Sequence, residues 1–102
     1  MYIVREIFQL QFGRHKEAKA LIDKGLKSGV MTPPAGSRIL TDFTGEGYRL
    51  ILESPFRSLG DYEAELKKEM SSAGWSEWYE QFKGLIRNSE REILKQIGEV
   101  SK

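Results

Sequence analysis

The sequence has no cysteine, a single histidine and no strong excess of either charge. Without cysteine, disulfides and thiolate metal sites are excluded, and one histidine among scattered carboxylates gives no paired-ligand spacing such as HExxH. Because 16 basic residues oppose 15 acidic ones, we expect neither a nucleic-acid partner nor a polybasic membrane-binding surface. We accordingly expect no metal and no cofactor.

Long apolar runs are also missing. None approaches the roughly 20 residues that a membrane span needs. The N-terminal stretch MYIVREIFQL carries Arg5 and Glu6 inside its apolar run, which is not typical of a signal peptide. We therefore expect a soluble, cytoplasmic protein. A chain of 102 residues is expected to form a single domain, 1–102, with one hydrophobic core.

The most clearly patterned stretch is 38–53, RILTDFTGEGYRLILE, which predicts two antiparallel strands joined by a type II′ turn at Gly45-Glu46. One face of this hairpin is apolar, and the other carries two pairs of opposite charge around an aliphatic pair. The predicted pairs are Phe43–Tyr48, Thr41–Leu50 and Ile39–Leu52 on the first face, and Asp42–Arg49, Leu40–Ile51 and Arg38–Glu53 on the second.

Alternation from Tyr2 to Phe12 predicts a first strand, and the helical spacing of 14–27, followed by Gly29, predicts a helix. Pro55 is expected to break the third strand. A second helical segment is expected to start at a Ser58 cap. Its apolar stripe is expected to be Tyr62, Leu66, Met70 and Ala73.

Gly74 should interrupt that segment, and Ser76 should cap its second piece, in which Phe82 falls on the core stripe. Residues 90–97 fit a strand or a helix, and we favour the strand. The element order is then β-α-β-β-α-β. Right-handed crossovers turn this order into a ferredoxin-like α+β fold, a four-stranded antiparallel sheet with helices on one face.

The two faces of the predicted sheet differ. The first strand directs a nearly continuous apolar row at the helices, with Glu6 as its odd member. The other face is half apolar and is left to water or to a partner. Its predicted members are Ile3, Ile7, Leu40 and Ile51 among Arg5, Arg38, Asp42, Arg49 and Glu53.

Three local features carry a resemblance to a known superfamily: 9–13 (QLQFG) running into a helix, the aromatic cluster in 75–82, and 91–94 (REIL). With the element order, they make the chain resemble the dimeric α/β-barrel proteins. Within these it looks most like small NIPSNAP-like proteins and cofactor-independent monooxygenases. The resemblance implies a homodimer in which two sheets face each other and enclose a barrel.

The function we predict is binding of a small molecule in a cavity between helices and sheet. The candidate ligand-binding residues are Arg5, Arg49, Trp75, Trp78 and Tyr79, with the arginines as polar anchors. Helical spacing also makes Trp78, Tyr79 and Phe82 ordinary core candidates, and the core is the simpler interpretation of these residues.

The alternative function is a cofactor-independent monooxygenase acting on an aromatic or polyketide-like substrate. Trp and Asn side chains shape the cavity of such relatives, whereas the only asparagine here is Asn88, outside the first strand where it is expected. The haem-degrading branch uses a histidine on the later helix, and no histidine follows His15. Catalytic residues are not assigned.

Overall fold

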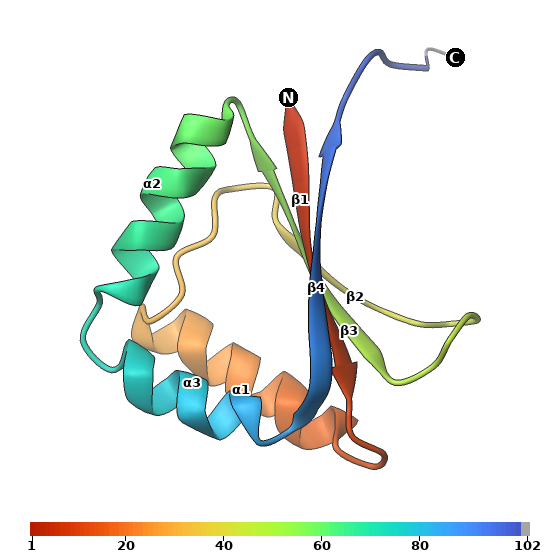
Figure 1. The fold of residues 1–102 in the computed structure, drawn as a ribbon, viewed down its shortest axis with the longest axis vertical. Helices are drawn as coiled ribbons and strands as arrows, with labels where there is room; N and C mark the ends of the chain where they lie inside the picture. Colours follow the sequence, from red (N-terminus) through yellow and green to blue (C-terminus); the bar gives the residue numbers. More distant parts are fainter. Residues whose placement is uncertain (101–102) are drawn as a thin grey trace.

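The computed structural model describes residues 1–100 and shows the predicted order of strands and helices (Figure 1). The ferredoxin-like α+β class is confirmed, with the second helical segment divided into two helices. Among the described residues, no helix has the length and apolar character needed to cross a membrane. The strands are β1 (Tyr2–Leu10), β2 (Arg38–Thr41), β3 (Arg49–Phe56) and β4 (Ile86–Lys95), and the helices are α1 (His15–Ser28), α2 (Leu59–Met70) and α3 (Trp75–Lys83).

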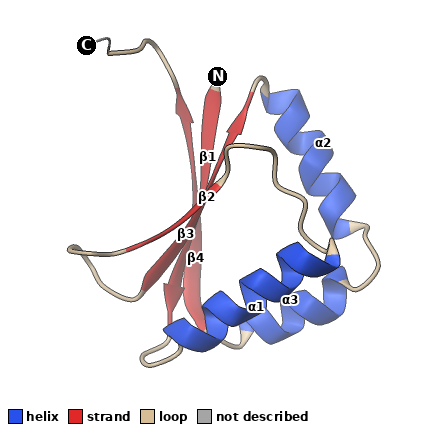
Figure 2. Cartoon of the chain, turned by 180° about the vertical axis from the view of Figure 1, so that it is seen from behind, coloured by secondary structure: helices blue, strands red, loops and turns tan. Residues whose placement is uncertain are grey.

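The sheet has the order β2-β3-β1-β4, and every neighbouring pair is antiparallel. All three helices lie on one side of it, and its other face carries no helix (Figure 2). We call this uncovered surface the open face. The long central strands β1 and β3 pair from Tyr2 opposite Phe56 to Gln9 opposite Arg49. These two strands form the centre of the sheet, on which the helices pack.

The register predicted for β2 and β3 is confirmed from Arg38 opposite Glu53 to Thr41 opposite Leu50. The prediction of a tight turn at Gly45-Glu46 is wrong, because β2 ends at Thr41 and β3 begins only at Arg49. The Asp42 carboxylate accepts a hydrogen bond from the Arg49 amide, at 3.3 Å. A side chain thus replaces the next backbone pair of the ladder, and the connection 42–48 becomes an open loop.

The aromatic pair predicted at the end of this hairpin is wrong as well. Phe43 is fully exposed, and the Tyr48 ring instead contacts the Phe12 ring, with 5.0 Å between centroids. Tyr48 has a φ of 56° and is the only non-glycine residue of the described chain with a positive φ. Such a left-handed backbone is rare for a residue other than glycine and does not fit the extended strand predicted here.

Three predicted element boundaries need correction. Strand β3 continues through Pro55 to Phe56. A residue without an N–H is tolerated there because β2 pairs with β3 only as far as Glu53, so one side of β3 is then a free edge. Helix α3 begins at Trp75 behind Gly74, whose φ is 84°, and not at a Ser76 cap. The strand favoured for 90–97 is confirmed through Lys95, where β4 ends.

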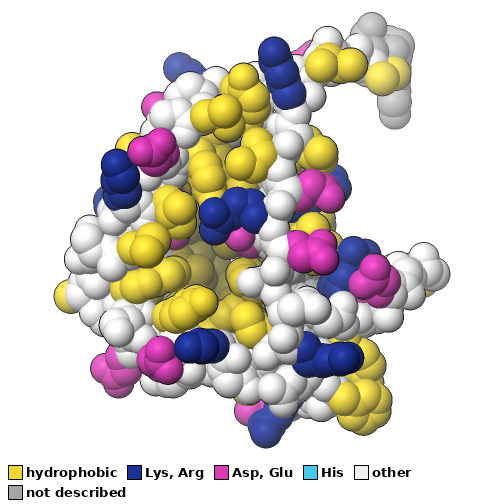
Figure 3. All heavy atoms as spheres, in the orientation of Figure 1, with side chains coloured by type: hydrophobic (Ala, Val, Ile, Leu, Met, Phe, Trp, Pro, Cys, Tyr) yellow, Lys and Arg dark blue, Asp and Glu magenta, His cyan; other side chains and the backbone are white. Residues whose placement is uncertain are grey.

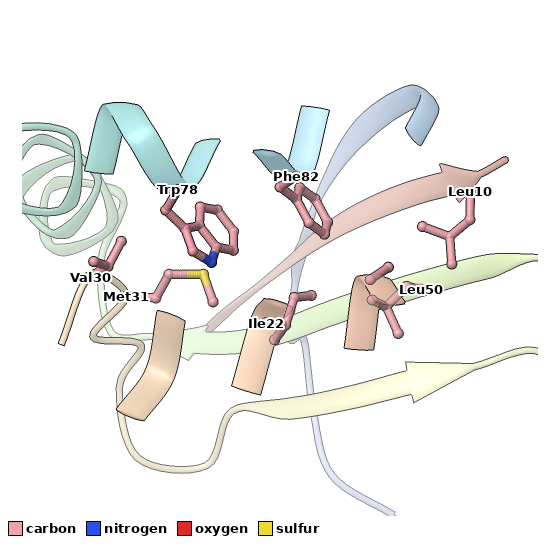
Figure 4. Close-up of a cluster of buried hydrophobic side chains, with 8 residues drawn as sticks. Leu10, Ile22, Val30, Met31, Leu50, Trp78 and Phe82 are labelled. Atoms are coloured by element: carbon pink, nitrogen blue, oxygen red, sulfur yellow. The ribbon is translucent and has the colours of Figure 1, made fainter. Parts of the chain in front are cut away.

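The core lies between the helix side of the sheet and the pair α1 and α3 (Figure 4). Ile22 of α1 and Phe82 of α3 are each 1% exposed, so the predicted core position of Phe82 is confirmed. The Phe82 ring stands edge-on to Phe8 of β1, at 4.8 Å between centroids. The buried cluster consists of Leu10, Ala18, Ile22, Val30, Met31, Leu50, Trp78 and Phe82.

Helix α2 is attached differently from the other two. Its Ser58 cap is confirmed, because the Ser58 hydroxyl accepts a hydrogen bond from the Asp61 amide at 3.0 Å. None of its residues is buried, however, and Met70 and Ala73 of its predicted apolar stripe are exposed. Helix α2 therefore lies over the sheet without a buried apolar anchor of its own.

Candidate functional site

A small cavity lies between α2, the sheet and the segment that leads from α1 to β2. Its volume is about 50 Å³. Seen with β4 in front, the surface between helices and sheet is hollowed and largely apolar, with basic and acidic side chains across its middle (Figure 3). The cavity is lined by Val4, Glu6, Pro33, Pro34, Leu52, Ser54, Phe56, Tyr62, Glu65, Leu66 and Glu69.

Glu6 is the polar centre on the sheet side of this cavity. Its carboxylate accepts hydrogen bonds from the Tyr62 hydroxyl at 3.1 Å and from Arg91 Nε at 2.7 Å. The Arg91 guanidinium also lies over the Tyr62 ring, 5.5 Å from its centroid. Burial and the nearby Glu6 charge raise the pKa of Tyr62 to about 12. Tyr62 is therefore a neutral hydrogen-bond donor across the physiological range.

Two further carboxylates line the cavity from α2. Glu69 accepts a hydrogen bond from the Thr32 amide at 3.0 Å, and Glu65 accepts one from the Thr32 hydroxyl. Burial is the main cause of a raised pKa at Glu69, and the charges of Glu65 and Glu6 add to it. The cavity thus combines apolar walls with three carboxylates. The Arg91 guanidinium compensates the charge of one of them, Glu6.

Arg5 and Arg49, the predicted polar anchors, lie on the open face. Arg5 Nε contacts Glu53 at 2.8 Å, and Glu53 also pairs with Arg38. These bonds, from Arg38 first and then Arg5, lower the pKa of Glu53. Arg49 pairs with Asp42 at 2.7 Å and lowers its pKa. A separate polar pocket of about 90 Å³ contains Arg49 and is lined by Ile7, Gln9, Glu46, Arg49, Asn88 and Glu90.

The predicted tryptophan and tyrosine residues lie on the helix side. Trp78 belongs to the core: its indole N–H donates to the Leu21 carbonyl at 2.7 Å, and its ring stacks on Phe82. Trp75 is partly exposed and stacks on Tyr79, which is exposed (5.7 Å between centroids). Because the sheet separates them from Arg5 and Arg49, one chain does not bring the five residues into one cavity.

The polar residues Glu6, Tyr62 and Arg91 were not predicted as site residues. Glu6 gave the only sequence signal, as the single charged member of the apolar row of β1. Tyr62 and Arg91 meet it from α2 and β4, at sequence separations that no local pattern reveals. Within residues 1–100, no group of three or more Asp, Glu or His side chains is placed to hold a metal ion.

Comparison with known proteins links the chain to a set of solved structures. No protein-family model matches the sequence, and no match was found among curated proteins. An uncharacterised NIPSNAP domain protein from Burkholderia xenovorans superposes with a TM-score of 0.83 at 14% identity, over 100% of both chains. A NIPSNAP family protein from Agrobacterium tumefaciens gives 0.76 at 21% identity, over 93% of this chain and 92% of that one.

A putative antibiotic biosynthesis monooxygenase from Nitrosomonas europaea is also similar, with a TM-score of 0.66 at 12% identity. The match covers 96% of this chain and 100% of that chain. At such identities the likeness establishes the fold. The resemblance predicted from the sequence is thus confirmed at that level, and the protein has the fold shared by NIPSNAP-like and antibiotic-biosynthesis-monooxygenase-like proteins.

Proposed function

We propose that the protein is a homodimer that binds a small molecule in the cavity beneath α2. The observation that supports this most directly is the combination of apolar walls with the hydrogen-bonded group of Glu6, Tyr62 and Arg91. Binding sites for small molecules are typically apolar clefts in which a few placed polar groups orient the ligand. The cavity has this composition, and it lies where the helical layer is least tightly packed on the sheet.

The lining also favours one kind of ligand. The carboxylates of Glu6, Glu65 and Glu69 are hydrogen-bond acceptors, and the walls formed by Val4 and Leu52 are aliphatic. A largely apolar molecule with one donating hydroxyl or amino group would match both parts. A carboxylate ligand would instead meet like charges here.

The homodimer is proposed because of the open face. Ile3, Ile7, Leu40 and Ile51 are only partly covered there, and Glu53 is already 94% buried by its arginine partners. A half-apolar sheet face without helices is suited to pack on a second copy. Two facing sheets would enclose the polar pocket that contains Arg49, and the ligand-binding role predicted for Arg5 and Arg49 would belong to that interior.

Light scattering at low micromolar concentration tests the dimer. We expect twice the chain mass of 11.7 kDa. Ile51→Lys, at the centre of the open face, should give the chain mass itself, whereas a lysine at Ala64 on the exposed side of α2 should leave the dimer intact. A wild-type protein of 11.7 kDa at all concentrations contradicts the proposal.

A fragment screen followed by protein-detected NMR tests the cavity. Binding fragments should shift the signals of Val4, Tyr62 and Leu66. Leu66→Trp, which fills the cavity, should abolish the shifts, and Ala64→Trp on the exposed side of the same helix should not. Fragments that shift only other regions, or that bind Leu66→Trp equally well, would refute the cavity as the binding site.

The alternative is a cofactor-independent monooxygenase. It is favoured by one observation: the Glu6 carboxylate, a group of the kind that serves as a general base, lies in the cavity beside the Tyr62 hydroxyl, a hydrogen-bond donor. Oxygen uptake with anthrone-like and quinol substrates tests it. Turnover above the buffer rate that is lost in a folded Glu6→Gln variant would make the protein an enzyme. Trp78→Ala is unsuitable as a test, because Trp78 is part of the core.

A further inference from the structure

The cavity beneath α2 is too small, as it stands, for the ligand proposed for it. Pockets for organic ligands usually measure roughly 300–1,000 Å³, and this one measures about 50 Å³. A volume of this size holds about a water molecule or two. If the cavity binds an organic molecule, one of its walls has to move outward.

The wall that can move is α2. The floor is formed by β1 and β3, which are paired along eight positions, and Val4 in that floor is 2% exposed. Helix α1 buries Ala18 and Ile22, and α3 buries Trp78 and Phe82, whereas α2 buries no residue at all. Moving α2 therefore exposes less buried apolar surface than moving the strands of the floor or the helices α1 and α3, and so costs less free energy.

Two hydrogen bonds with Thr32 hold α2 at its C-terminal half. The Thr32 amide donates to Glu69 at 3.0 Å and its hydroxyl donates to Glu65, so one residue binds two turns of the helix. Thr32 itself is well anchored. It directly follows Val30 and Met31, which are 8% and 7% exposed in the core, and the Met31 amide donates to the Gly25 carbonyl of α1 at 3.1 Å.

The next two residues of the same segment, Pro33 and Pro34, form part of the cavity wall. Tyr62 adds a hydrogen bond from its hydroxyl to Glu6. Its ring also contacts Phe56, at 5.3 Å between centroids, and lies under the Arg91 guanidinium. The contacts made by Thr32 therefore lie beside the cavity and join its fixed wall to its movable one.

We propose that α2 is the gate of the cavity and that Thr32, bound to Glu65 and Glu69, is the clasp that keeps it closed. A ligand enters when both hydrogen bonds of the clasp open and α2 swings away from the sheet. The proposal rests on the function proposed above, since it names how access to that same cavity is controlled. Its test is nevertheless independent of any ligand.

The test uses the absence of cysteine from the chain. Val4→Cys places one thiol on the floor of the cavity with little change of volume, and a maleimide reagent then reports how often the floor becomes accessible. Two variants open the clasp in this background. Thr32→Val removes the hydroxyl but keeps the amide, and Glu69→Ala removes the acceptor of that amide.

Each clasp variant should increase the rate of thiol labelling about fivefold, which corresponds to about 1 kcal/mol for one hydrogen bond. The matched control is Glu63→Ala, which removes a carboxylate from the exposed side of α2, where Glu63 contacts Lys67. The control should label at the parent rate. Low concentrations of urea should barely change the rate, since opening the gate exposes far less surface than global unfolding.

Equal labelling rates in the parent and both clasp variants would overturn the gate, as would a urea dependence equal to that of global unfolding. A gate that passes this test while no fragment binds the cavity would refute the proposed function and leave the gate intact. If fragments bind the cavity but the clasp variants leave the labelling rate unchanged, the gate is refuted and the proposed function stands.

Discussion

At the scale of single residues, Glu6 determines the polar character of the cavity. It points from the apolar row of β1 toward the helices, where a charge needs partners, and Tyr62 and Arg91 supply them. Because Arg91 donates from the edge strand β4 and Tyr62 from α2, Glu6 also links α2 to the paired strands β1 and β4. The same carboxylate thus serves stability and, in our proposal, ligand orientation.

The charge of Glu6 should be measurable in the titration of Tyr62. Burial and Glu6 together raise the pKa of Tyr62 to about 12. Glu6→Gln removes the negative charge and should lower this pKa toward, but not to, the ordinary value of 10, because burial remains. Tyrosine-selective carbon-13 NMR can follow Tyr62 separately from the other tyrosines, with Tyr62→Phe for assignment. An unchanged pKa in Glu6→Gln would show that the two side chains do not interact in solution.

Phe82 is a central residue of the hydrophobic core. It is 1% exposed and contacts both Trp78 and Phe8. Phe82→Ala should lower the free energy of unfolding by about 3–5 kcal/mol, since it removes transfer energy and leaves a void. Trp75→Ala should be milder, because Trp75 is only partly buried. Urea denaturation of both variants checks the order, and an unchanged midpoint for Phe82→Ala contradicts it.

At the scale of elements, the three helices differ in how closely they approach their neighbours. Helices α1 and α3 pack so closely at Gly25 that a Cβ there would lie 2.8 Å from Nε1 of Trp78. This indole is itself fixed by its bond to the Leu21 carbonyl. Helix α2 has no comparable contact and depends on Thr32 and Tyr62 instead.

Glycine-to-alanine substitutions in α1 and α2 should therefore have opposite signs. Helix propensity alone predicts that each stabilises by up to about 1 kcal/mol. Gly25→Ala should destabilise, because the new methyl group collides with the anchored indole of Trp78. Gly60→Ala, where the added atom comes no closer than 3.8 Å to Ser58, should stabilise. Thermal unfolding compares the two, and a higher melting temperature for Gly25→Ala would contradict the close packing.

At the scale of the whole molecule, charge is arranged by face. The open face carries ion pairs centred on Glu53 and Asp42, whose carboxylates have lowered pKa values because of their arginine partners. The cavity beneath α2 carries the carboxylates that lack full compensation, and Glu69 there has a raised pKa. Lowering the pH should accordingly destabilise the ion pairs of the open face and reduce the repulsion among the carboxylates of the cavity.

The dependence of stability on pH follows from these directions. A carboxyl whose pKa is lower in the folded state stabilises above its unfolded pKa, and this contribution is lost as the pH falls through the folded value. Glu53→Gln should therefore reduce stability at pH 7 and show a flatter decline below about pH 4 than the wild type. Urea midpoints measured from pH 7 to pH 3 provide the test. Parallel curves for the two proteins would show that Glu53 does not carry the acid sensitivity.

Much of this architecture follows from local pattern. Alternation along 38–53 predicts the β2–β3 register, because a slip by one residue would reverse both faces. The Ser58 cap and the break at Gly74 are likewise local signals. The turn at Gly45-Glu46 was mispredicted, because Asp42 bonds the Arg49 amide and opens the loop. Local propensity does not predict this loop, because the hydrogen bond from the Arg49 amide to the Asp42 side chain replaces a backbone pair of the ladder.

The sequence by itself determined the element order, the strand register and the half-apolar open face, since each depends on spacing between near neighbours. Only the tertiary structure decided where the predicted site residues lie. Trp78 and Arg5 had equal standing in the sequence, yet the sheet places them on opposite sides, one in the core and one in an ion pair. The group of Glu6, Tyr62 and Arg91 likewise arises only on folding, because its members come from three elements up to 85 residues apart.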